Sequence, residues 1–142
     1  MNAQVRVTFI LKEISNIFHD SIYITGTFNQ WDSTANTLYM MHPLSQSEKT
    51  ITLNLLPGTF RYKFHRGGWL KVEKGFWGNE VADREIVLLK DTILRDVVSG
   101  WRDELFIDKW RGLLPSAPDT TKLLNMGSLA NIYAFNLEYY NA

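Results

Sequence analysis

Apolar and polar residues alternate in short runs over the first hundred positions, a pattern typical of half-buried β-strands. The alternating runs are residues 5–11, 22–25, 50–55 and 60–65, and further runs cover 85–89 and 92–98. Turn residues separate these runs, and no helical periodicity lies between them. The pattern therefore predicts an all-β fold, an immunoglobulin-like antiparallel β-sandwich of about seven strands.

Two pairs of turn residues suggest how the strands connect. Pro57-Gly58 has a proline that presets φ and a glycine that tolerates positive φ, so it predicts a tight turn. We expect residues 60–65 to return after this turn as the partner strand of 50–55. Gly67-Gly68 predicts a second hairpin turn, which leads into an extended segment over 69–72.

The pattern changes after Trp101. Residues 101–111 carry one apolar face, which predicts one or two helical turns ended by Gly112, and residues 121–140 are apolar without a regular period. We therefore divide the chain into a β-sandwich over residues 1–103 and a short, partly helical C-terminal extension over residues 104–142. If exposed, the apolar side chains of residues 120–140 would form a contact surface for a partner or a second copy of the chain.

Composition excludes several classes of function. The 142 residues contain 15 Lys and Arg against 15 Asp and Glu, a balance that argues against nucleic acid or a membrane surface as the partner. No apolar run reaches the length of a membrane span. The absence of cysteine removes disulfides and thiolate metal sites. The first residues lack the order of a signal peptide, but a processed chain would look the same, so the compartment stays open.

No catalytic or metal-binding motif is present. The three histidines, His19, His42 and His65, are far apart, and neither a nucleophile elbow nor a phosphate loop occurs. The carboxylates between residues 73 and 85 lie among lysines and arginines, which is typical of a charged rim rather than of paired catalytic acids. We therefore expect no enzyme activity, no cofactor and no metal in this chain.

The aromatic residues, 13% of the chain, carry the most specific indication of function. Trp31 lies in a polar loop after Gly26, where a core position is unfavourable, and Trp69 follows the diglycine turn. Lys63 lies on the non-aromatic face of the preceding strand. Two indoles and a long cationic donor suit sugar recognition, since pyranose rings stack on flat apolar surfaces while their hydroxyls take hydrogen bonds. The alternative is that both indoles pack the ends of the sandwich.

Three segments in order carry a family resemblance. They are the run from Ile22 to Trp31 (IYITGTFNQW), the run from Leu56 to Phe64 (LPGTFRYKF), and Gly67-Gly68-Trp69. Residues 22–88 thereby resemble the starch- and glycogen-binding modules of carbohydrate-binding families 20 and 48, including the glycogen-binding domain of the AMP-activated kinase β subunit. Residues 63–84 and 98–103 are similar to family-20-like modules that precede esterase-like α/β-hydrolase domains in bacterial polysaccharide-degrading proteins.

The resemblance, which covers about residues 4–103, implies non-catalytic binding of a starch- or glycogen-type α-glucan and targeting of an associated hydrolase. It assigns Trp31 and Trp69 as stacking platforms and Lys63 as a donor to sugar hydroxyls. The alternatives are another polysaccharide, a β-sandwich scaffold or protein-interaction domain without sugar binding, and a small hydrolase.

Three further positions are implied by the same resemblance. Glu73 matches the acidic residue that follows a tryptophan in family 20, although here three residues separate it from Trp69. Asp83 replaces the family asparagine and accepts, but does not donate, a hydrogen bond as an amide would. Trp77 is an extra aromatic near the same end and would add a platform.

Overall fold

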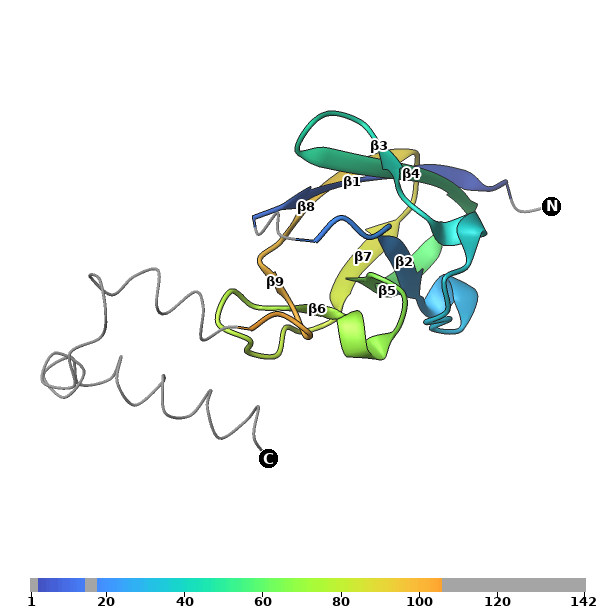
Figure 1. The fold of residues 1–142 in the computed structure, drawn as a ribbon. Coiled ribbons are helices and arrows are strands. Elements are labelled where there is room, and N and C mark those ends of the chain that lie inside the picture. Colours follow the sequence, from blue (N-terminus) through green and yellow to red (C-terminus); the bar gives the residue numbers. More distant parts are fainter. Residues whose placement is uncertain (1–2, 15–17, 106–142) are drawn as a thin grey trace, which may run out of the picture. The chain divides into compact units, whose positions relative to one another are not determined.

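The computed structural model describes residues 3–14 and 18–105 (Figure 1). The chain divides into two compact units, Met1–Asp103 and Glu104–Ala142, and the description that follows concerns the first. The predicted helical turns beyond residue 105 and the apolar surface over 120–140 lie outside the described residues.

The described part consists of short strands joined by turns and single 3₁₀ turns. The strands are β1 (Val5–Glu13), β2 (Tyr23–Gly26), β3 (His42–Pro43), β4 (Glu48–Leu55), β5 (Gly58–His65), β6 (Glu73–Lys74), β7 (Arg84–Leu88), β8 (Thr92–Val98) and β9 (Gly100–Trp101). The 3₁₀ turns are η1 (Thr27–Asn29), η2 (Thr37–Tyr39) and η3 (Trp69–Lys71). No helix among the described residues is long and apolar enough to cross a membrane.

The strands form two main sheets and one small pair. One sheet has the order β3-β4-β1-β8, the second β2-β5-β7, and β6 pairs with β9 (Figure 1). All pairs are antiparallel except β1 with β8, which run parallel from Val7↔Thr92 to Glu13↔Val98. The all-β sandwich predicted from the alternating pattern is confirmed.

The connections differ from those predicted at two turns. Residues 60–65 do not pair with 50–55, because β4 pairs with β1 and β3 while β5 pairs with β2 and β7. The turn at Pro57-Gly58 instead carries the chain from one sheet to the other, with Gly58 at φ 154°. Each strand then buries its apolar face by packing across the core. The segment after Gly68 is the 3₁₀ turn η3 rather than an extended strand.

The core contains residues from both sheets. Its buried members are Val5, Val7, Phe9, Leu11, Ile22, Ile24, Met41, Ile51, Tyr62, Phe64, Leu88, Val98 and Trp101. The rings of Phe9 in β1 and Tyr62 in β5 meet edge-on, with their centroids 4.9 Å apart. Burying a side chain of this size stabilises the fold by about 1.5–3 kcal/mol, so these contacts fix β5 and the loops at its ends.

Candidate functional site

Trp31 and Trp69 lie side by side although they come from different loops. Their ring centroids are 6.3 Å apart and their planes are inclined by 39°. Trp69 is 40% exposed and Trp31 is half-buried, so the pair presents aromatic surface to solvent. The structure thus brings together the two indoles that the sequence singled out.

The backbone around Trp31 is held in a strained conformation. Gln30 and Trp31 both adopt the left-handed region, with φ of 55° and 56°. For residues with a Cβ this costs on the order of 1 kcal/mol each, and such strain clusters at functional sites. The Trp31 N–H donates to the Gly26 carbonyl at 2.9 Å, and buried Asn29 accepts from the Gly26 N–H at 3.0 Å. These hydrogen bonds hold the backbone that carries the Trp31 ring.

A compact turn positions Trp69 at the end of β5. Gly67 and Gly68 have φ of 112° and 144°, which residues with a side chain rarely adopt. The N–H of Lys71 then donates to the Gly68 carbonyl at 3.0 Å, and that of Val72 donates to the Trp69 carbonyl at 3.3 Å. These bonds close the 3₁₀ turn that carries the indole.

Lys63 and Asp83 form an ion pair beside this end of the sheet. The Lys63 Nζ lies 3.6 Å from Oδ1 of Asp83. Lys63 is mostly buried along its stem, whereas 40% of the Asp83 side chain is exposed. A cation and a carboxylate at this separation offer both a donor and acceptors to a hydroxyl-rich ligand.

Glu73 lies in the interior and its oxygens are engaged by the protein. The residue is 1% exposed. Its Oε1 accepts from the Phe64 N–H at 3.2 Å, and its Oε2 accepts from Nη2 of Arg84 at 2.8 Å. The carboxylate therefore links β6 to β5 and β7 instead of pointing to the surface with the indoles.

Trp77 lies in a separate loop after β6. Its ring packs edge-on against Phe76, with centroids 4.5 Å apart and planes at 89°. The loop is closed by the Gly75 N–H, which donates to the Asn79 carbonyl at 2.8 Å. Trp77 is half-buried and Phe76 is 37% exposed, so this loop shows a second aromatic surface.

Arg66 is a buried arginine that forms ion pairs with two aspartates, and it was not identified from the sequence. Its side chain is buried, donates to Asp103 at 2.7 and 3.1 Å and to Asp20 at 2.9 Å, and lies 3.6 Å above the Phe18 ring. The Arg66 and Lys71 side chains lower the pKa of the Asp20 carboxyl. Arg66 thus ties the segment before the Trp69 turn to Asp20, which precedes β2, and to Asp103, which follows β9. The position of an arginine next to a diglycine turn was the only sequence indication.

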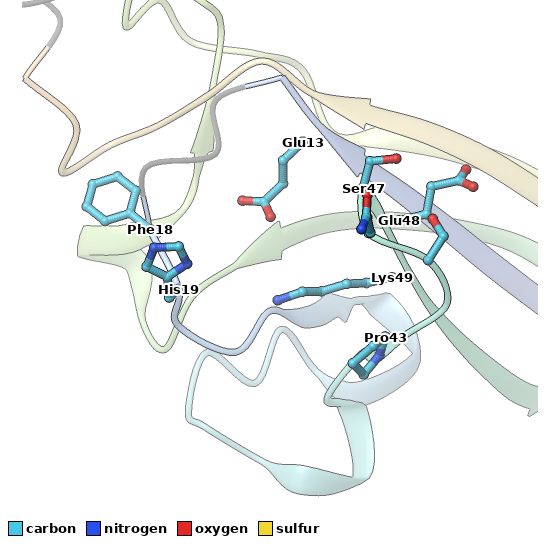
Figure 2. A pocket seen from close by; sticks show the side chains of 9 residues that line it. Glu13, Phe18, His19, Pro43, Ser47, Glu48 and Lys49 are labelled. Carbon is cyan, nitrogen blue, oxygen red and sulfur yellow. The ribbon is translucent and has the colours of Figure 1, made fainter.

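A cavity of about 390 Å³ lies elsewhere in the fold, and none of the six residues predicted for the site lines it (Figure 2). Figure 2 shows Glu13, His19 and Lys49 around it, with Phe18 at one side. Burial raises the pKa of Glu13, although the indole N–H of Trp101 donates to its Oε1 at 3.1 Å. Within the described ranges, no group of three or more His, Cys, Asp or Glu side chains is placed to hold a metal ion.

The fold is a β-sandwich with two adjacent indoles, and the comparisons with known proteins identify the class as a carbohydrate-binding module. Residues 19–76 match the family described as the glycogen recognition site of AMP-activated protein kinase, and this match supports a glycogen- or starch-binding module. The resemblance drawn from the three motifs is thereby confirmed. The family is a non-catalytic one.

Two relatives contain a similar segment. An amylopullulanase from Thermoanaerobacter thermohydrosulfuricus is 35% identical over 106 residues, which cover 70% of this chain and 7% of that protein. An amylopullulanase from Thermoanaerobacterium thermosulfurigenes is 36% identical over 92 residues, 59% of this chain and 5% of that protein. The chain therefore spans only a small part of the length of these relatives.

A leucine-rich repeat protein from Bacteroides thetaiotaomicron aligns by structure over 68% of this chain and 12% of that one. The TM-score is 0.36 and the identity 15%.

Proposed function

We propose that residues 1–103 form a non-catalytic module that binds α-glucan of the starch or glycogen type, with Trp31 and Trp69 as stacking platforms. The observation that carries the proposal is the inclination of 39° between two indoles only 6.3 Å apart. Successive glucose rings of an α-1,4-linked chain are turned relative to one another, so the chain curves. Two inclined platforms fit such a curve better than they fit a flat β-1,4-linked chain.

We assign Lys63 and Asp83 as the polar groups of the proposed site. Lys63 would donate to a sugar hydroxyl and Asp83 would accept from one, each exchanging part of the long 3.6 Å ion pair for the ligand. Trp77 and its neighbour Phe76 would flank a longer chain. Glu73 is left out of the proposed site, because both of its oxygens already accept hydrogen bonds inside the protein.

The proposed site is shallow, which sets its affinity. Stacking on two rings and a few hydrogen bonds give a binding free energy of roughly −4 to −8 kcal/mol, that is, millimolar to micromolar affinity. Retention on a polymer then comes from repeated sites and from tethering. Since the relatives are named amylopullulanases and are far longer than this chain, we propose that the module targets an associated hydrolase to its polysaccharide.

Affinity electrophoresis tests the proposal. Wild type, Trp31→Ala and Trp69→Ala are run in gels that contain soluble starch or glycogen, with xylan and a cellulose derivative for comparison. Leu70→Ala is the matched control, because Leu70 lies next to Trp69 in η3 and is 73% exposed. We expect the α-glucans to retard wild type and the control, and each tryptophan variant to lose at least about tenfold in affinity.

The alternative function is a scaffold or protein-interaction domain. It is favoured by exposed apolar side chains on the edge strands, namely Val87 in β7 and Ile93 and Val97 in β8, which are 63%, 67% and 46% exposed. Absence of retardation in every gel, with the fold intact by circular dichroism, would exclude the binding module and favour this alternative.

A further inference from the structure

His65 lies beneath the turn that carries Trp69. The imidazole is completely buried and stacks on Tyr23, with ring centroids 5.5 Å apart and planes inclined by 16°. Its Nδ1 accepts two backbone hydrogen bonds, from Gly67 N–H at 3.0 Å and from Gly68 N–H at 3.1 Å. One side-chain atom thus anchors both glycines of the turn.

This geometry requires an uncharged imidazole. A ring nitrogen accepts a hydrogen bond only when it carries no proton, so Nδ1 is bare and the proton of the neutral ring is on Nε2. Burial lowers the pKa of His65, which favours the same neutral form. Protonation at Nδ1 would place an N–H against two N–H groups.

The two hydrogen bonds to Nδ1 hold the turn that positions the Trp69 indole. Gly67 and Gly68 both have positive φ. The Gly68 carbonyl accepts from the Lys71 N–H at 3.0 Å, and this bond closes η3, whose first residue is Trp69. We propose that His65 is a positioning residue, whose bare Nδ1 fixes the turn so that Trp69 stays in register with Trp31 for carbohydrate. This inference rests on the proposed function. His65 itself touches no sugar.

Among His65 and the charged groups around it, we expect only the imidazole to change its charge at mildly acidic pH. Burial lowers the pKa of His65 and outweighs two effects that raise it, a hydrogen bond to the Asp32 backbone and the negative charge of the Asp32 carboxylate. Hydrogen bonds from Thr34 and Asn36 lower the pKa of Asp32 to about 2, so this carboxylate stays ionised. On the other sides Tyr23 stacks on the ring, the cationic Lys63 precedes it by two residues in β5, and Arg66 is directed to Asp20 and Asp103.

Affinity for starch should decrease at acidic pH, because protonation of His65 removes the acceptor at Nδ1. The neutral ring accepts the two hydrogen bonds, so affinity is at its maximum above the ordinary histidine pKa of about 6.5. It falls at lower pH as His65 becomes protonated. Starch and glycogen carry no titrating group. A loss of affinity in this range therefore reports on the protein.

Two variants separate the anchoring atom from the ring. His65→Asn places an amide oxygen near the position of Nδ1, where it accepts from the same two N–H groups and does not titrate. His65→Phe keeps a ring on Tyr23 but has no acceptor. For soluble starch at about pH 7.5, we expect the Asn variant to bind within about twofold of wild type and the Phe variant to lose about five- to tenfold. Only wild type should weaken as the pH falls to about 5.

A measurement without sugar keeps this inference separable from the proposed function. Nitrogen-15 NMR of the imidazole should show a neutral ring with the proton on Nε2, and the Trp69 indole N–H resonance should follow the His65 titration in wild type and not in the Asn variant. Circular dichroism at each pH verifies folding. A proton on Nδ1, or wild-type affinity in the Phe variant, would overturn the inference. Failure of wild type to bind starch at any pH would contradict the proposed function instead.

Discussion

Individual side chains near the proposed site divide into those that face a ligand and those that hold the framework. Trp69 and Asp83 present exposed atoms, whereas Glu73 and His65 are buried and bonded within the protein. Sequence patterns name the type of residue at a position but do not say whether its polar atoms are already used. For this reason Glu73 resembled a sugar ligand in the sequence, and His65 resembled an isolated histidine.

Glu73→Gln tests the framework assignment. Glutamine keeps an acceptor for Phe64 but leaves Arg84 without its buried carboxylate, so we expect a loss of about 2 kcal/mol in the free energy of unfolding. Urea denaturation measures it. Glu85→Gln is the control, because the exposed Arg61–Glu85 pair contributes only about 0.5 kcal/mol. Starch affinity should not change in either variant, and a weaker affinity without a loss of stability would return Glu73 to the site.

At the level of elements, the alternating pattern predicted the six longer strands, but not the two-residue strands β3, β6 and β9. It did not predict which strand pairs with which, since a period of two fixes a face but leaves the partner open. The crossing at Pro57-Gly58 and the parallel pairing of β1 with β8 therefore came only from the structure. The same holds for the meeting of Trp31 and Trp69, which depends on two loops that are far apart in the sequence.

Gly26→Ala tests the contact between β2 and β5. A Cβ at this position would lie 2.3 Å from the Arg61 carbonyl oxygen and 2.8 Å from Cε1 of Phe28, so the backbones would have to separate. We expect a destabilisation of at least about 2 kcal/mol by thermal or urea unfolding. Starch affinity should fall as well, because Gly26 accepts the Trp31 N–H. Ser21→Ala, at an exposed position before β2, should match wild type; equal stability of the two variants would contradict the close approach.

The whole molecule carries equal numbers of acidic and basic residues, which suits an uncharged polymer. Stacking and hydrogen bonds to hydroxyls are not screened by salt, whereas binding to a polyanion loses affinity steeply with ionic strength.

We therefore expect starch affinity to change by less than about twofold between roughly 0.05 and 1 M NaCl. Isothermal titration with a soluble maltooligosaccharide measures this, and a sulfated polysaccharide serves as the comparison. A tenfold loss in high salt would indicate that Lys63 and Asp83 act mainly through charge.

The parallel pairing of β1 with β8 also determines how the module responds to force. Val5 and Val98 lie at opposite ends of the paired strands, because the register runs from Val7↔Thr92 to Glu13↔Val98. Tension applied at these two residues acts along the strands and loads all the hydrogen bonds between them together. An antiparallel pair pulled from adjacent ends would open one bond after another. Such a force shears β1 against β8, so the sandwich resists extension along the direction of these two strands.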